Sequence, residues 1–125
     1  MSRVLIIDDA EFMRRAIKLM LEKNGFHVVG EAENGIEGVI EYKKTRPDIV
    51  TMDITMPEMS GIEALKSIME FDPKANVVML SAMGQENLIK ESVINGAKSF
   101  LVKPFKEEQV VKTLKQIETY NLRRL

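Results

Sequence analysis

Several features common in other proteins are missing from this sequence of 125 residues, and each absence excludes a class of protein. There is no cysteine, so disulfides and thiolate metal sites are excluded, and a reducing environment is suitable. No apolar stretch approaches the roughly 18–20 residues that a membrane-spanning helix needs. The first residues, MSRVLIIDD, contain two acids where a signal peptide would be apolar. We therefore expect a cytoplasmic protein without a membrane segment.

An excess of charge of either sign is also missing. The 18 basic and 19 acidic residues leave a net charge of −1, so no general attraction to nucleic acid or an anionic membrane is expected. Apolar residues make up 45% of the chain, which is too many for a disordered protein. No internal repeat, linker or low-complexity segment divides the sequence. We therefore expect residues 1–125 to form one domain with a substantial core.

Short apolar runs typical of β-strands occur five times along the chain. They are RVLII (3–7), HVVGEA (27–32), DIVTM (48–52), NVVML (76–80) and SFLV (99–102). The first, third and fourth are continuously apolar instead of alternating, as expected for parallel strands that are covered on both faces.

Helical patterns lie between and after these runs. The apolar positions that mark the helices are Met13, Ala16, Ile17, Met20 and Leu21; Ile36, Val39 and Ile40; Gly61, Ala64, Leu65 and Ile68; Leu88, Ile89 and Val93; and Val110, Leu114 and Ile117. Asn24-Gly25 is typical of a helix end, and Ser60 with Glu63 is typical of a capping box. Right-handed crossovers would fold this (βα)5 pattern into a three-layer α/β sandwich.

Polar residues follow the apolar runs at one predicted edge of the sheet. Asp8 and Asp9 follow the first run, Asp53 the third, Ser81 the fourth and Lys103 the fifth. Ligands of open α/β sheets bind beyond the carboxyl ends of the strands, so these residues are candidates for a site. The first and third strands are neighbours in the common doubly wound orders, which would place the three acids close together.

Three neighbouring carboxylates need positive charge. Two of them about 4 Å apart repel by roughly 4 kcal/mol at an effective dielectric near 20. Lys103 can compensate one charge, and Mg²⁺, which prefers carboxylate, water and phosphate oxygens, can compensate the others. Such a site suits phosphoryl transfer, in which a carboxylate can be the nucleophile. Asp53 is the central candidate because it stands alone at the end of an apolar strand.

Each of these residues also has a simpler interpretation when it is taken alone. Asp9 is a possible N-cap of the first helix, Ser81 a loop serine and Lys103 a solvated surface lysine. Met56-Pro57 and Ser60-Gly61 are compatible with ordinary loop residues. Their joint placement at the ends of four strands favours a functional site.

The segments IIDDAEFMRR, DIVTMDITMPEMSGIEAL, VVMLSAMGQ and GAKSFLVKPF together resemble the receiver domain of two-component response regulators. The resemblance runs from Arg3 to about Leu122 and is strongest to the stand-alone receivers of chemotaxis. It implies a flavodoxin-like fold whose parallel five-stranded sheet has the order 2-1-3-4-5, with strands numbered along the chain.

The resemblance also implies roles for the residues at the sheet edge. Asp53 would be the phosphoacceptor, and Lys103 would pair with the phosphoryl group, with a cis peptide before Pro104. Asp9 and Asp53 would bind Mg²⁺ directly, Asp8 largely through water, and Thr55 through its backbone carbonyl.

A conformational switch is implied as well. Ser81 would move to hydrogen-bond a phosphoryl oxygen, and Phe100 would turn into the space that Ser81 leaves. The face formed by the helix around Leu88–Val93, the strand 99–102 and the last helix would then change shape. Gly84 would give the moving loop its freedom.

Two departures from well-known members of the family affect these expectations. Many chemotaxis receivers have tyrosine where this chain has Phe100, so a hydroxyl contact with a partner would be lost. The positions that tune phosphoryl lifetime in the family are Thr55 and Met83 here. Neither carries an acid or amide to orient a water, which predicts slow to moderate self-dephosphorylation.

The function implied is a phosphorylation-activated switch, a regulatory protein that assists its own Mg²⁺-dependent phosphorylation and dephosphorylation but is not an enzyme. Implied partners are a histidine kinase of the CheA type, a flagellar motor switch protein or an archaeal adaptor, and a phosphatase. We expect a monomer that binds neither nucleic acid nor membrane. A single-domain phosphorelay intermediate of another pathway remains the alternative.

Other classes of function fit the sequence less well. A flavodoxin needs a phosphate cradle after its first strand, where DDAEFMR would repel phosphate. Phosphatases of the haloacid-dehalogenase type carry a D-x-D pattern there and a cap domain, for which no residues remain. A DNA-binding regulator normally has an output domain, and Arg123 and Arg124 are more typical of a solvated helix end.

Overall fold

The computed structural model describes residues 1–123. Strands and helices alternate along them in the order β1 (Arg3–Ile7), α1 (Glu11–Lys23), β2 (His27–Ala32), α2 (Gly35–Thr45), β3 (Ile49–Asp53), α3 (Gly61–Phe71), β4 (Val77–Ser81), α4 (Glu86–Ile94), β5 (Ser99–Val102) and α5 (Glu107–Arg123). Within this range no helix combines the length and apolar character needed to cross a bilayer. Arg124 and Leu125 lie outside the described residues, so the expected domain 1–125 and the expected helix end at Arg123 and Arg124 are covered only in part.

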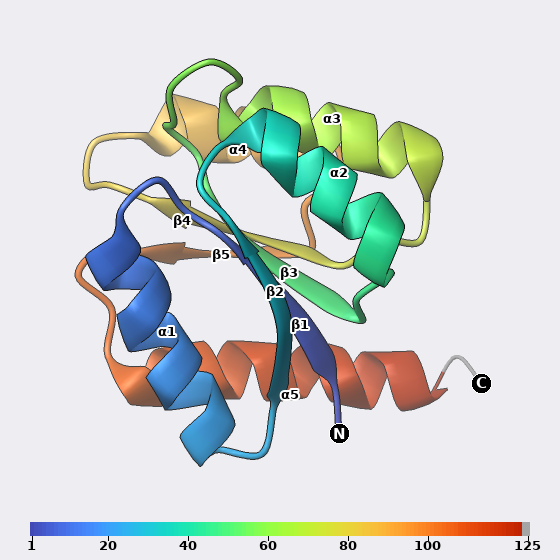
Figure 1. The fold of residues 1–125 in the computed structure, drawn as a ribbon. Coiled ribbons are helices and arrows are strands. Elements are labelled where there is room, and N and C mark those ends of the chain that lie inside the picture. The colour runs from blue at the N-terminus through green and yellow to red at the C-terminus, as the bar shows by residue number, and fades with distance from the viewer. Residues whose placement is uncertain (124–125) are drawn as a thin grey trace.

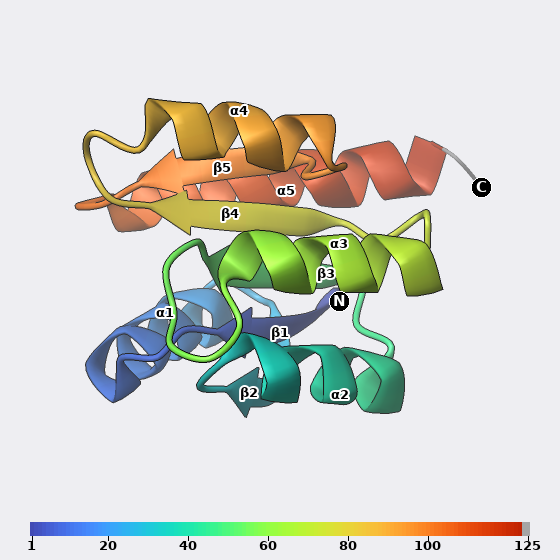
Figure 2. The same cartoon turned by 90° about the horizontal axis from the view of Figure 1, so that it is seen from above.

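The five strands form one parallel sheet of order β2-β1-β3-β4-β5. Helices α1 and α5 cover one face of the sheet, and α2, α3 and α4 cover the other (Figure 1). Figure 2 shows the carboxyl ends of the strands at a common edge of the sheet. The predicted (βα)5 sandwich and its strand order are confirmed.

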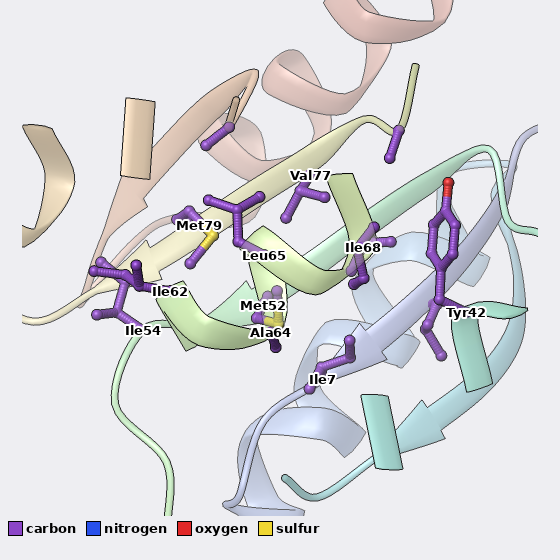
Figure 3. Close-up of a cluster of buried hydrophobic side chains, with 14 of the residues drawn as sticks. Ile7, Tyr42, Met52, Ile54, Ile62, Ala64, Leu65, Ile68, Val77 and Met79 are labelled. Atoms are coloured by element: carbon purple, nitrogen blue, oxygen red, sulfur yellow. The ribbon is translucent and has the colours of Figure 1, made fainter. Parts of the chain in front are cut away.

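Two separate cores explain why the central strands are continuously apolar. On β1, Val4 and Ile6 face the core under α1 and α5, whereas Leu5 and Ile7 face the core under α2 and α3. Large members of the first core are Ile17, Leu21, Phe26, Ile49, Val78, Leu80, Val110 and Leu114. Large members of the second, drawn in Figure 3, are Tyr42, Met52, Ile54, Leu65, Ile68, Val77 and Met79. Burial on both faces holds the sheet rigidly beneath the edge that carries the polar residues.

Strands β3 and β4 lie one residue further along the chain than their apolar runs predicted. Asp53 is the last residue of β3, and Ser81 is the last residue of β4. The predicted first residues, Asp48 and Asn76, precede the strands, and each adds side-chain hydrogen bonds to a backbone bond with a neighbouring strand. Asp48 Oδ2 accepts from the Arg3 N–H at 2.8 Å, and Asn76 Nδ2 donates to the Asp48 carbonyl at 3.1 Å. Since Asp53 pairs with Leu80 and Ser81 with Val102, both candidate site residues have the fixed backbone of a strand.

The predicted helix ends are confirmed where local chemistry determines them. Helix α1 buries Ile17 and Leu21 and ends before Gly25, whose φ of +86° favours glycine. Helix α3 begins with a complete capping box. Ser60 Oγ accepts from the Glu63 N–H at 3.2 Å, and Glu63 Oε1 accepts from the Ser60 N–H at 3.1 Å.

Helix α2 forms where predicted, but it does not bury its isoleucines. Ile36 and Ile40 are exposed, and the helix turns Gly38 and Tyr42 toward the core. A Cβ at Gly38 would lie 2.7 Å from Ile7 Cδ1, so the helix backbone lies directly on β1. This close approach, which the apolar spacing does not encode, determines the buried face.

Helix α4 packs on the core through only part of the apolar set that marked it in the sequence. Val93 is exposed, whereas Ser92 is fully buried. The Ser92 hydroxyl donates to the Leu88 carbonyl at 2.8 Å, which makes its burial inexpensive. Helix α4 therefore attaches to the protein mainly through its partly buried residues Leu88 and Ile89.

Candidate functional site

Three carboxylates meet at the carboxyl edge of the sheet. Asp8 and Asp9 follow β1, and Asp53 ends β3, which pairs with β1. Asp8 is fully buried, Asp53 is 8% exposed and Asp9 is exposed. One oxygen atom of each carboxylate lies within 4.8 Å of the oxygens of the other two. The three acids that the sequence placed at this edge are thus near neighbours.

Lys103, which follows β5, lies against the same acids. Its Nζ is 3.4 Å from Asp8 Oδ2 and 3.6 Å from Asp53 Oδ1. Its side chain is only 26% exposed, so the alternative of a freely solvated lysine is wrong. The peptide between Lys103 and Pro104 is cis, as expected. One ammonium group among three carboxylates leaves two negative charges for another cation.

The surroundings of Asp53 disfavour its charged form. Burial raises the pKa of the Asp53 carboxyl from 3.8 to about 6. The ammonium of Lys103 and a hydrogen bond from the Thr55 N–H lower this pKa, while the charges of Asp8 and Asp9 raise it. A cation bound beside Asp53 would relieve this cost.

Asp8 is held in place by the first turn of α1. Its Oδ1 accepts from the Ala10 N–H at 2.9 Å, and its carbonyl accepts from Arg14 Nη1 at 2.8 Å. The Arg14 guanidinium is also paired with Glu31 of β2, with Nε and Oε1 3.3 Å apart. The N-cap of α1 is Ala10, without a side-chain cap, so the alternative in which Asp9 caps this helix is wrong.

Sequence analysis missed Arg14 and Glu31 as supports of the site. The two residues meet between a helix and an edge strand, and no spacing rule connects them. The only available clue was a basic residue one turn after an acidic pair.

Ser81 carries a buried hydroxyl without a partner. It is fully buried at the end of β4, and its Oγ makes no hydrogen bond within the described residues. An unsatisfied buried hydroxyl costs roughly 1–3 kcal/mol. Since β4 pairs with β3, this hydroxyl lies at the same edge as Asp53, where an additional acceptor atom would satisfy it.

Thr55 is linked to the loop after β4 by a residue that sequence analysis did not single out. Its N–H donates to Asp53 Oδ1 at 3.4 Å, a long contact, and its hydroxyl accepts from Gln85 Nε2 at 2.9 Å. The oxygen of the same amide, Gln85 Oε1, accepts from the Ala82 N–H at 2.7 Å. Thr55 and Met83 still carry no acid or amide of their own, but an amide from Gln85 lies beside Thr55.

Phe100 and Met83 do not join the acidic cluster. They line a separate pocket of about 350 Å³ whose walls include none of the three carboxylates. Phe100 is 44% exposed, and Met83 is exposed. The pocket is lined by Ala82, Met83, Gly84, Gln85, Glu86, Ile89, Phe100 and Val102. The loop after β4 therefore separates the acids from an apolar surface.

The acidic cluster has the donor set of a site for a hard divalent cation. Its donors are oxygen atoms, two negative charges remain after the contribution of Lys103, and the three acids are close enough to share one ion. Carboxylate oxygens in this number are typical ligands of Mg²⁺. The residues present therefore fit a divalent metal ion.

Comparisons with known proteins agree with this geometry. Residues 4–115 match the model of the response regulator receiver domain. The chemotaxis protein CheY of Thermotoga maritima is 54% identical over 116 residues, which are 93% of this chain and 97% of that protein. CheY of Bacillus subtilis is 54% identical over 112 residues, 90% of this chain and 93% of that protein.

A solved structure matches the fold equally well. The crystal structure of a CheX-CheY-BeF3-Mg complex from Borrelia burgdorferi superimposes with a TM-score of 0.89 at 43% identity. The match covers 93% of this chain and 88% of that chain.

The order of the parallel sheet and the acids and lysine at its carboxyl edge are the arrangement of a receiver domain, and the chain belongs to the response regulator receiver family. More narrowly, it is a chemotaxis response regulator similar to the CheY proteins. The resemblance seen in the sequence is confirmed.

Proposed function

We propose that this receiver accepts a phosphoryl group on Asp53 from a histidine kinase and transmits the change to a partner of the chemotaxis motor. The observation that carries the proposal is the convergence of three carboxylates with the ammonium of Lys103 and the unpartnered hydroxyl of Ser81. These groups supply a nucleophile, a fixed positive charge and a free donor at one edge of the sheet.

The chemistry follows from the positions of these groups. A carboxylate oxygen of Asp53 attacks the phosphorus of a phosphohistidine, the P–N bond breaks and an acyl phosphate forms. The released imidazole nitrogen takes up a proton from solvent. Lys103 holds positive charge beside the added phosphate, and Ser81 donates its hydroxyl to one of the new oxygens. The receiver thereby assists its own phosphorylation and the later hydrolysis.

We infer that the divalent cation is Mg²⁺. Asp8, Asp9, Asp53 and the carbonyl of Thr55 would hold it, and it would supply charge neutralisation for phosphate oxygens. The Borrelia complex, which contains Mg as well as BeF3, supports this choice. The raised pKa of Asp53 adds support, since a bound cation would favour the carboxylate.

The output of the switch is proposed to pass through the face formed by α4, β5 and α5. Movement of Ser81 toward phosphate would vacate space for Phe100, which now lies 44% exposed beside an apolar pocket. Phosphate must favour one of two arrangements by a few kcal/mol for this to act as a switch. The expected partners are a flagellar motor switch protein or an archaeal adaptor.

Further partners and the cellular setting are part of the proposal. CheX accompanies CheY in the Borrelia complex, which supports a phosphatase as a partner class here. We propose that residues 1–125 act as a single receiver domain and as a monomer in the cytoplasm, where the kinase and the motor would be met. A phosphorelay intermediate of another pathway is the competing function.

The test is direct phosphorylation with a small donor. The protein is incubated with Mg²⁺ and acetyl phosphate or phosphoramidate, and its intact mass is measured. One phosphoryl group is expected on the native protein and none on Asp53→Asn. Labelling that persists at another residue would contradict the assignment of Asp53. A second experiment distinguishes chemotaxis from a phosphorelay: capture of the beryllofluoride form by a motor protein supports the first, and capture by a relay kinase supports the second.

A further inference from the structure

The side chain of Gln85 forms the link between the two loops that flank the phosphoacceptor. Gln85 precedes α4, yet its amide makes no capping bond to that helix. It accepts from the Ala82 N–H at 2.7 Å and donates to the Thr55 hydroxyl at 2.9 Å. The bond to Thr55 ties the loop after β4 to the loop after β3, and the bond to Ala82 braces the loop after β4 internally.

The loop after β4 has little else to hold it in place. Ala82, Met83 and Gly84 are all exposed. Gly84 has a φ of +87°, and a Cβ built there would meet nothing within 4 Å. The apolar pocket beside the loop leaves about 350 Å³ into which it can move. The hydrogen bonds of the Gln85 amide can therefore determine the conformation of the loop after β4.

The hydrogen bond to Ala82 involves a donor that phosphate would need. Ala82 directly follows Ser81, and Asp53 is paired with Leu80 in the sheet, so the Ala82 N–H lies at the same edge as Asp53. A phosphoryl group adds strong acceptor oxygens that require donors. The carboxamide oxygen of Gln85 already occupies this N–H.

We propose that Gln85 is a positioning residue that holds the loop after β4 in the arrangement seen here and competes with phosphate oxygens for the Ala82 N–H. Activation then requires the Gln85 amide to release Ala82 before the loop can close on the phosphoryl group. This inference rests on phosphoryl acceptance at Asp53, the function proposed above.

Two substitutions at this position separate competition from simple structural support. Gln85→Met keeps the size of the side chain and removes both hydrogen bonds. Gln85→Glu keeps an acceptor for the Ala82 N–H and strengthens it by charge. Competition predicts opposite effects of the two on binding of a phosphate mimic, whereas a structural role predicts that both weaken it or that neither matters.

The experiment titrates the native protein and the variants with beryllofluoride at saturating Mg²⁺ and follows amide resonances by NMR. Loss of one hydrogen bond of ordinary strength predicts beryllofluoride affinity roughly three- to tenfold higher in Gln85→Met. Gln85→Glu is expected to bind more weakly than the native protein. Before any beryllofluoride is added, the Ala82 amide proton should move upfield in Gln85→Met.

Asn87→Ala, an exposed substitution in the first turn of α4, is the matched control and should leave the affinity unchanged. If Gln85→Met does not give a folded spectrum, Gln85→Ala replaces it with the same expected direction. Affinity of the uncharged variant equal to or below that of the native protein, or an unmoved Ala82 resonance, overturns the role of Gln85. A native protein that forms no beryllofluoride adduct overturns the proposed function as well, and this result is distinguishable from the others.

Discussion

The backbone of Gly61 lies directly against the carbonyl of Asp53. A Cβ at Gly61 would overlap the Asp53 carbonyl oxygen and would lie 2.8 Å from the Cα of Ile54. The Gly61 N–H also donates to the Ile54 carbonyl at 2.7 Å. The first residue of α3 is therefore packed on the backbone of Asp53, the proposed phosphoacceptor, and only glycine fits there.

Gly61→Ala is expected to lower the free energy of unfolding by roughly 2–4 kcal/mol, because the backbone of β3 or of α3 must move. Urea denaturation measures this change. The control is Gly25→Ala, where a Cβ meets nothing within 4 Å and only the φ of +86° is unfavourable, so that about 1 kcal/mol is expected. Equal losses in the two variants would contradict the packing argument.

Asp53→Asn is expected to stabilise the metal-free protein at neutral pH. The pKa of Asp53 is raised from 3.8 to about 6, so the folded protein binds a proton at this carboxylate more tightly than the unfolded chain does. The stability linked to this proton is complete below pH 3.8 and is lost as the pH rises through about 6. The variant should gain roughly 1–3 kcal/mol above pH 6 and almost nothing near pH 4.

Thermal unfolding in EDTA across this pH range measures the effect. Addition of Mg²⁺ should stabilise the native protein more than the variant. A stability difference that does not change with pH would show that the charge of Asp53 is not its cause.

Ser81→Ala should weaken the binding of a phosphate mimic without lowering the stability of the protein. Its Oγ is buried and unpartnered, so its removal should leave the free energy of unfolding unchanged or slightly higher. The same substitution should weaken beryllofluoride binding about tenfold, because one donor to the mimic is lost. Thr51→Val is the control, since Thr51 Oγ1 is also buried and unpartnered but lies in the middle of β3. Equal weakening in both variants would argue against a specific role for Ser81.

Lys103→Met is expected to affect metal and phosphate in opposite ways. Loss of the ammonium group beside Asp8 and Asp53 should increase Mg²⁺ affinity about three- to tenfold by removing a repulsive charge. The rate of phosphorylation by acetyl phosphate should fall at least about tenfold, because the positive charge beside phosphate is gone. Calorimetry and intact mass give the two quantities, and Lys106→Met, which is exposed, should change neither.

The lifetime of the phosphoryl group should respond to Met83. Neither Thr55 nor Met83 offers an acid or amide to orient a water, so decay in Mg²⁺ after removal of the phosphodonor should be slow to moderate. Met83→Glu should accelerate it severalfold, while Val93→Glu, also exposed, should not. Rapid decay of the native phosphoprotein would contradict the prediction for these two positions.

The fold could be predicted from the sequence because each strand is indicated by a pattern of residues close together in the chain. The continuous apolar character of Val4–Ile7 and the capping box at Ser60 depend on neighbours in the chain, and both appear as predicted. The approach of Gly38 to Ile7 depends instead on how a helix lies on a sheet. No pattern along the chain records that distance, so the apolar spacing that marked α2 could not show that Gly38 and Tyr42 face the core.

The candidate site shows the same division. Asp8, Asp53 and Lys103 were predictable because parallel strands end at one edge, which gathers whatever follows them. Gln85 and Arg14 were not, since Gln85 donates to Thr55 in the loop after β3 and Arg14 pairs with Glu31 of β2. Such contacts can be identified only when the positions of the atoms in the folded protein are known.

Helix α4 has one buried residue, Ser92, whereas α3 has five, of which Ala64, Leu65 and Ile68 are completely buried. Regions with few buried contacts open at lower free energy than the global unfolding of the protein. Amide protons of α4 are therefore expected to exchange with solvent well before those of α3. Asp53, the proposed phosphoacceptor, ends the fully buried strand β3, where slow exchange is expected, whereas faster exchange is expected for the helix beside the apolar pocket. The proposed signalling surface could then rearrange while the sheet stays folded.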